Sequence, residues 1–153
     1  MNAFFEPRSV AYLCSSKIVI ASMNNRSQNT WYHDDEVTIL PLEGTNENIA
    51  NCVLRHLSLS KFMEMSYDDI RVLYKRFLNN GGYKTEKSFF SEAKRVSIVR
   101  ELDMYCFMPF NSKPADKVFL GNPGQMQKSP LTIGPDGFAE ILRDCWDKCS
   151  FIN

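Results

Sequence analysis

The chain has 153 residues, of which 44% are hydrophobic and 24% are charged, a composition typical of one globular domain rather than of a disordered or fibrous chain. Eighteen Lys and Arg balance eighteen Asp and Glu, so no overall charge attracts a nucleic acid or an anionic membrane. The longest uninterrupted apolar stretch, 104–108, is far shorter than the roughly 20 residues of a membrane-spanning helix. We expect a single folded domain over 1–153, with neither a membrane nor a nucleic acid as a direct partner.

The cysteines indicate a reducing compartment. Their number is odd, no two are spaced as Cys-x-x-Cys, and the chain is long enough to stabilise its own core. Such cysteines are typically free thiols that pack as small apolar side chains. The first residues also lack the basic and apolar segments of a secretion signal, so we expect a cytoplasmic protein. The cysteines are Cys14, Cys52, Cys106, Cys145 and Cys149.

The N-terminal part of the chain predicts three strands and a helix. Two runs rich in β-branched and aromatic residues, 10–14 and 17–23, suit a hairpin, and a third strand is expected at 36–40. Thr45 or Asn46 can then supply the N-cap of a helix. The apolar residues of this helix recur at helical spacing and predict one face packed on a sheet, namely Ile49, Cys52, Val53 and Leu57.

The clearest helix is predicted over 66–80. Ser66 and Asp69 resemble a capping box at its start, and Gly81-Gly82 ends it. Its apolar face consists of Ile70, Leu73, Tyr74 and Phe77.

The C-terminal part repeats the order of the N-terminal part. Strands are predicted at 96–100, 103–108 and 130–133, and Asp136 can serve as the N-cap of a final helix. The apolar stripe of that helix consists of Phe138, Ile141, Leu142, Cys145 and Cys149.

Two gapless matches link these parts. The segment Phe4 to Met23 aligns with Phe90 to Pro109, and Asn48 to Phe62 aligns with Gly137 to Phe151. Because the matched positions fall on the same predicted elements, the sequence predicts an internal duplication.

The expected fold class is therefore α+β, built from an internally duplicated β-β-β-α unit with pseudo-twofold symmetry. The first copy spans 3–62, the connecting helix 66–80 and the second copy 89–151. The pattern leaves open whether the strands form one sheet or two.

The first candidates for general acid or base catalysis are the two histidines, because the ordinary pKa of histidine lies near neutrality. His56 lies just beside the apolar stripe of its helix, which indicates a residue on the helix flank. His33 lies between aromatic and acidic residues, and we interpret it as part of a solvated loop or the entry to a strand. Neither pattern predicts a catalytic residue.

A metal site could use Cys145 and Cys149, one helical turn apart, with His56 or Cys52 from the first helix. The spacing matches no structural zinc site, however, and cysteine in an apolar stripe usually packs in the core. The loop 121–124 matches no phosphate-binding pattern either. No metal, no cofactor and no catalytic residue are predicted.

Charged residues suggest a protein partner. Basic residues between 84 and 100 are mixed with acidic ones and indicate a solvated face. Acidic residues, in contrast, gather beside large aromatics at 31–36, at 64–69 and around Trp146, as suits a surface that docks on a basic protein. The predicted partner-binding residues are Trp31, Tyr32, Asp34, Asp35 and Glu36.

The two predicted helices also carry a resemblance to a known family. The residues concerned run from Glu47 to Leu57 and from Asp136 to Trp146. With them, the chain resembles over almost its whole length the bacterial immunity proteins of contact-dependent growth inhibition systems. A glycine near the start of the family's helices is replaced here by Ala50 and Ala139.

This resemblance implies a cytoplasmic protein that is not an enzyme. It would bind the toxin domain of an effector, expected to be a basic nuclease, and block its active site or substrate surface. Immunity proteins of nucleases are often acidic, whereas this chain is neutral, so a local patch must carry the complementary charge.

Two alternatives stay open at this point. A small enzyme or ligand-binding domain would place its site between the two copies, where His56, Cys145 and the segment 111–129 would converge. A nucleic-acid accessory domain would use the basic residues between 84 and 100.

Overall fold

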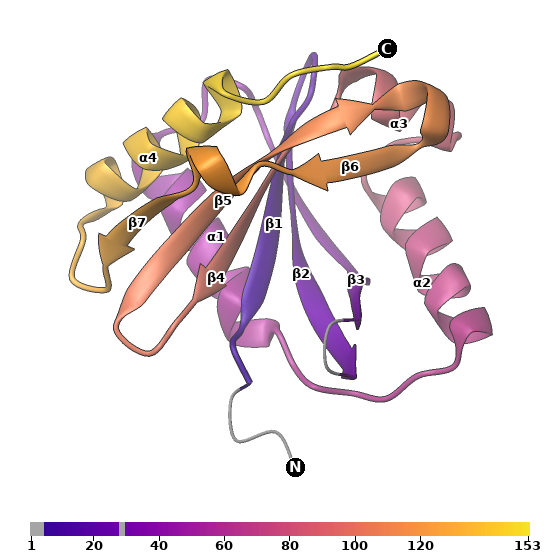
Figure 1. The fold of residues 1–153 in the computed structure, drawn as a ribbon, viewed down its shortest axis with the longest axis horizontal. Helices are drawn as coiled ribbons and strands as arrows, with labels where there is room; N and C mark the ends of the chain where they lie inside the picture. The colour runs from indigo at the N-terminus through magenta and orange to yellow at the C-terminus, as the bar shows by residue number, and fades with distance from the viewer. Residues whose placement is uncertain (1–4, 28–29) are drawn as a thin grey trace.

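The computed structural model describes residues 5–27 and 30–153, and within them one antiparallel sheet of seven strands is covered by helices on both faces (Figure 1). The predicted α+β class is confirmed, and the strands form one sheet. The strands are β1 (Arg8–Leu13), β2 (Ile18–Ser27), β3 (Thr30–Leu40), β4 (Lys94–Arg100), β5 (Met104–Lys113), β6 (Val118–Gly121) and β7 (Gln127–Pro130). The helices are α1 (Asn46–Leu59), α2 (Tyr67–Asn80), α3 (Glu86–Glu92) and α4 (Pro135–Asp147).

The strand order is β3-β2-β1-β4-β5-β6, with β7 as a second partner of β5. β5 is long enough to pair with two short strands in succession along one edge. Its first half pairs with β7 through 104–107, and its second half pairs with β6 through 110–113. β3 forms the opposite edge of the sheet.

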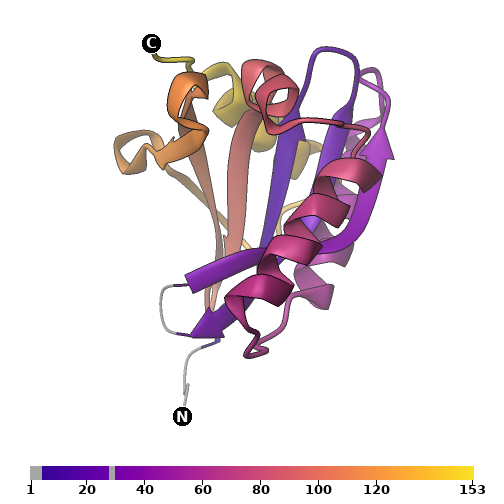
Figure 2. The ribbon, with the colours of Figure 1, turned by 90° about the vertical axis from the view of Figure 1, so that its right-hand side faces the viewer.

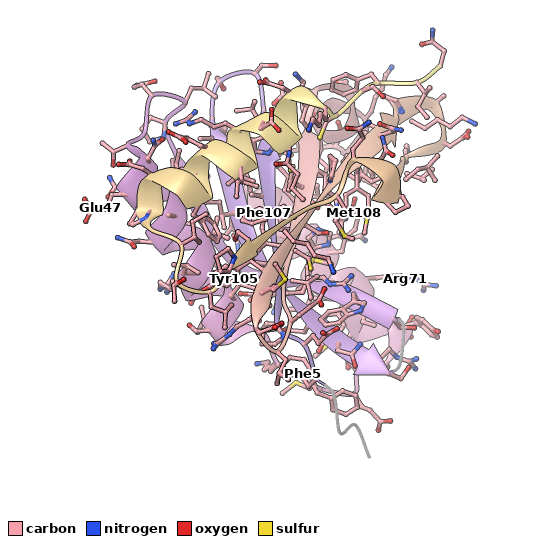
Figure 3. All side chains as sticks on the ribbon, turned by 60° about the vertical axis from the view of Figure 1, so that its left-hand side comes forward. Phe5, Glu47, Arg71, Tyr105, Phe107 and Met108 are labelled. Carbon is pink, nitrogen blue, oxygen red and sulfur yellow. The ribbon has the colours of Figure 1, made fainter. Side chains whose placement is uncertain are left out.

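Two cores lie on the two faces of this sheet, because successive side chains of a strand point to opposite faces. α1 and α4 cover one face, where Trp146 is buried and its Nε1–H donates to the Ala11 carbonyl at 3.1 Å. α2 and α3 cover part of the other face, around Tyr12, Phe77 and Phe89. Consecutive residues of β5 illustrate the alternation, since Phe107 packs on Phe138 of α4 whereas Met108 points away from that helix (Figure 3).

The helix caps follow the predictions in two cases. The Thr45 hydroxyl accepts from the backbone N–H of Asn48 at 3.2 Å, so Thr45 rather than Asn46 caps α1. The Ser66 hydroxyl accepts from the Asp69 N–H at 3.1 Å at the start of α2. The prediction for the last helix is wrong, because Gly134 is the N-cap of α4 and Pro135, which has no N–H to satisfy, is its first residue.

Some elements differ from those predicted. β3 begins at Thr30 rather than at 36, and β7 covers 127–130 rather than 130–133. α3 and β6 were not predicted. Seven residues with two buried phenylalanines are too short to show a helical stripe, and β6 has only four residues.

The two halves have related geometry. β1 and β4 pair antiparallel at the centre of the sheet, and β4 and β5 begin at the residues that the first sequence match pairs with the starts of β1 and β2. Phe62 and Phe151, paired by the second match, each form a parallel bridge, with Asn25 and with Ser112 respectively. The duplication itself stays a prediction, and Phe4 lies outside the described residues.

Candidate protein-docking surface

The predicted partner-binding residues lie on the edge strand β3, which divides them between the two faces of the sheet. The Glu36 carboxylate pairs with Arg55 of α1 at 2.9 Å, whereas the Asp35 carboxylate faces Arg76 of α2 at 3.6 Å. Trp31 lies on the α2 face, with the Arg8 guanidinium 4.2 Å from its ring centroid. The structure therefore does not gather these residues on one surface.

Two of the five predicted residues form hydrogen bonds within the protein itself. Tyr32 is only 3% exposed, and its hydroxyl donates to the Met63 carbonyl at 3.0 Å. Burial opposes ionisation of Asp34, but hydrogen bonds from Asn24 and from the Glu36 backbone outweigh it and lower the pKa of Asp34. That all five residues bind a partner stays a prediction.

The segment between α1 and α2 lies beside the end of β2 and is fixed there by hydrogen bonds. The Asn25 N–H donates to the Lys61 carbonyl, and the Met63 N–H donates to the Asn25 carbonyl, both at 2.9 Å. The Ser60 hydroxyl donates to the Met23 carbonyl at 2.6 Å and accepts from the Arg8 N–H at 3.0 Å. The segment therefore presents its side chains from a fixed backbone.

Large apolar side chains on this segment are exposed among carboxylates. Phe62, Met63 and Tyr67 are 46%, 41% and 59% exposed. The Tyr67 ring is held by the Arg26 guanidinium, 4.3 Å from the ring centroid. Exposed apolar side chains rimmed by polar ones mark interaction sites. We call this surface the docking segment, and it consists of Phe62, Met63, Glu64, Tyr67, Asp68 and Asp69.

Sequence reasoning found only part of the docking segment. The acidic residues and Tyr67 belong to the second of the three acidic-aromatic groups. Phe62 and Met63 were not predicted as contact residues. Their position between the end of one helix and the N-cap of the next could have indicated that these large apolar side chains are exposed.

His33 was expected in a solvated loop or at the entry to a strand; it lies within β3, and it packs against the aromatic core instead of facing solvent. Its ring stacks on Phe77 with centroids 4.1 Å apart, and its Nε2 lies 2.6 Å from the Tyr12 hydroxyl. Tyr12 accepts from Arg95 at 3.3 Å, so its own proton is directed at His33. Burial first and then the charge of Arg95 hold the pKa of His33 well below its usual value, while burial raises the pKa of Tyr12 to about 12. His33 is therefore a neutral acceptor.

His56 is fully buried rather than on a helix flank. Its Nδ1 lies 3.1 Å from the Ser22 hydroxyl and its Nε2 lies 2.8 Å from the Thr38 hydroxyl, so the ring joins α1 to β2 and β3. Burial is the main reason why the pKa of His56 is lowered.

The residues considered for metal binding or catalysis contact different strands. His56 is bonded to β2 and β3, whereas the Cys145 thiol lies 3.7 Å from the Gln127 amide of β7. Burial raises the pKa of Cys145 to about 12, and Cys149 donates to the Arg95 carbonyl at 3.3 Å. Across 5–27 and 30–153, no group of three His, Cys, Asp or Glu side chains is arranged to hold a metal ion. Of the enzyme alternative, Cys145 does lie beside the segment 111–129 through Gln127, whereas the side-chain hydrogen bonds of His56 go to β2 and β3.

The basic residues between 84 and 100 do not share one face. Lys84 borders a groove of about 760 Å³ between α2 and α3, together with Arg71 and Lys75. Lys94 and Arg95 are consecutive in β4 and therefore point to opposite faces of the sheet. Arg95 lies among aromatic rings instead of on a solvated surface.

Of the helices in the described chain, none is long and apolar enough to span a membrane.

The fold and this surface define a small α+β domain with exposed apolar side chains among carboxylates. No protein-family model matches the sequence, and no curated protein is similar to it. Solved structures do share the fold. A protein of unknown function from Neisseria meningitidis superposes with a TM-score of 0.83 at 18% identity, over 97% of this chain and 98% of that one.

The fold is also shared with a chain of a toxin and immunity complex. A chain of the CdiA-CT/CdiI toxin and immunity complex from Yersinia pseudotuberculosis superposes with a TM-score of 0.80 at 14% identity, over 95% of this chain and 98% of that one. At such identities the likeness establishes a shared fold.

Proposed function

We propose that this chain is an immunity protein that acts in the cytoplasm by binding, rather than by catalysis, and neutralises the toxin domain of a contact-dependent growth inhibition effector. The fold likeness to a toxin and immunity complex over 95% of the chain carries this proposal. The resemblance of the segments 47–57 and 136–146 to immunity proteins is a second, sequence-based support.

The docking segment is the surface that we assign to the toxin. Phe62 and Met63 provide apolar anchors, and Glu64 and Asp69 attract a basic protein, with a smaller part for Asp68, which already pairs with Arg71 at 3.0 Å. A toxin that acts on a nucleic acid has a basic substrate surface, and this acidic segment would cover it. Such local complementarity requires no net charge on the whole immunity protein, which has none.

The neighbouring end of β3 adds to this surface. The Tyr32 hydroxyl donates a hydrogen bond to the Met63 carbonyl, so β3 helps to fix the backbone of the docking segment. Asp34 lies on the same face of β3 as Tyr32 and stays ionised through its hydrogen bonds. Asp35 and Glu36 are already paired with arginines, and we assign them a smaller part.

The binding test mixes the full chain with the toxin domain encoded beside its gene and determines the mass of the complex after size-exclusion chromatography. We expect a one-to-one complex. Phe62→Ala should weaken it by about tenfold or more, because truncation of a central anchor removes about 1.4 kcal/mol or more of binding free energy. Glu64→Lys combined with Asp68→Lys should slow association, most strongly at low salt.

Phe151→Ala is the matched control. Phe151 is 43% exposed and forms the same kind of parallel bridge as Phe62, beside β5 instead of β2. It should bind the toxin like the wild type. If Phe151→Ala weakens binding and Phe62→Ala does not, the docking segment is the wrong surface; if the wild type forms no complex, the proposed function is wrong.

A further inference from the structure

Two arginines lie on the face of the sheet that α2 and α3 only partly cover. Arg8 begins β1 and pairs with Val99 of β4, whereas Arg95 of β4 pairs with Tyr12, so the two arginines lie four positions apart along the central strand pair. Arg8 shares a face with Val10 and Tyr12 by strand alternation, and Arg95 contacts Tyr12 directly. Figure 2 shows α2 over β2 and β3 and α3 at one end of the sheet, while β4 and β5 have no helix over them on this face.

Aromatic rings hold both guanidinium groups in place. The guanidinium carbon of Arg8 lies 4.2 Å from the ring centroid of Trp31, and that of Arg95 lies 4.6 Å from the centroid of Phe110. Stacking on a ring leaves the edge of a guanidinium, with its N–H donors, free for other partners. Arg95 uses one of these donors on the Tyr12 hydroxyl.

Neither arginine forms an ion pair with a described acidic side chain, and the charge of Glu6 only partly offsets the lowering of the pKa of Arg8. The ion pairs of the described residues involve other cations, and the Nε atoms of both Arg8 and Arg95 are buried without a hydrogen bond. The residues outside 5–27 and 30–153 include no Asp or Glu that could supply one. Buried donors without a partner are rare in folded proteins and call for an explanation.

The two charges also repel each other. Burial lowers the pKa of Arg8, and the positive charge of Arg95 lowers it further. Both arginines are half-buried, and two cations that repel each other destabilise a fold, so an anion bound to them reduces that cost. An oxyanion is the matching ligand, because a planar guanidinium binds carboxylate or phosphate oxygens through two parallel hydrogen bonds.

We propose that Arg8 and Arg95 form an oxyanion-binding site on the α2 face of the sheet. The ligand is a phosphate-like or carboxylate group, held by the free N–H edges of the two stacked guanidinium groups. The site is separate from the docking segment and does not depend on the proposed function.

Thermal unfolding of the full chain in sodium phosphate, compared with sodium chloride at the same pH and ionic strength, tests the site without any partner. Phosphate should raise the Tm of the wild type in a concentration-dependent way, because a ligand that binds only the folded state stabilises it. An equal Tm in phosphate and chloride would overturn the proposal, and this measurement requires no variant to fold.

Single-residue variants then show which arginines bind the phosphate. Arg95→Lys and Arg8→Lys keep the charge but lose the two-pronged geometry, and each should weaken phosphate binding by about tenfold or more. Arg55→Lys, on the exposed surface of α1, is the control and should respond to phosphate like the wild type. A phosphate response that is the same in all three variants would show that the anion binds elsewhere, which contradicts the proposal.

The source of the oxyanion is decided with the toxin complex. If a carboxylate of the partner fills the site, phosphate should compete with the toxin and Arg95→Lys should weaken the complex. If a free anion fills it, phosphate should leave the affinity for the toxin unchanged. Either result keeps the site, and absence of a toxin complex would affect the proposed function alone.

Discussion

His33 shows how a single buried side chain makes the stability of this protein depend on pH. It stacks on Phe77 and accepts from Tyr12, which in turn accepts from Arg95. Protonation of His33 would place a third charge beside Arg95 and remove the acceptor of the Tyr12 proton. His56 is likewise buried, between Ser22 and Thr38. Both rings are neutral in the folded protein and can be protonated in the unfolded chain.

The free energy of unfolding should therefore fall on acidification. The pKa of each histidine is lower in the folded protein, so the unfolded chain binds more protons below about pH 6.5 and stability is lost as the pH falls through that value towards the folded pKa. Urea unfolding between pH 7.5 and 5 measures this slope. His33→Gln, which accepts a hydrogen bond but does not titrate, should make it shallower by up to about 1.4 kcal/mol per pH unit. An unchanged slope would contradict the buried, neutral state of His33.

At the scale of elements, the docking segment depends on how α1 ends. The helix stops at Leu59, and the Ser60 hydroxyl then joins the chain to β2 and to β1 through Met23 and Arg8. This junction sets the backbone path on which Phe62 and Met63 are presented.

Ser60→Ala should lower the free energy of unfolding by about 1–3 kcal/mol, because it leaves a buried carbonyl and a buried N–H without a partner. Ser58→Ala is the control, since its exposed hydroxyl only donates to the Arg55 carbonyl of its own helix, and it should stay within about 0.5 kcal/mol of the wild type. Chemical denaturation compares the two variants. Equal effects would show that Ser60 does not fix the segment.

The elements that could be predicted are those with strong local signals. α2 has a capping serine at one end and two glycines at the other, and α1 has an apolar stripe. α3 is stabilised by two buried phenylalanines that pack in a core with residues of distant strands. A local sequence pattern does not show such packing. β3 was expected to start late because its polar residues resemble a loop, although alternate ones face the two helix layers.

For the site, too, local features could be predicted from the sequence, whereas contacts between distant segments could not. Acidic residues next to aromatics were visible in the sequence, but their distribution between faces depends on β3 continuing to Thr30 as an edge strand. The partners of Asp35 and Glu36 come from α2 and α1, far away in the sequence. The Arg8 and Arg95 pair depends on the central pairing of β1 with β4, which only the folded chain reveals.

At the scale of the whole molecule, a zero net charge is compatible with local groups of like charge. The docking segment gathers carboxylates around exposed apolar side chains. The two arginines without an ion pair lie on the α2 face of the sheet. The neutral chain can therefore carry both proposed sites, an acidic docking surface and a basic anion site.

Growth of cells that produce the toxin domain, with and without this chain, measures the proposed neutralisation itself. We expect the wild type and Phe151→Ala to restore growth, and Phe62→Ala combined with Glu64→Lys to protect poorly at the same protein level, because the complex is weaker. If the folded wild-type chain is present in excess and growth is not restored, the chain is not the immunity protein of that toxin and the proposed function is wrong.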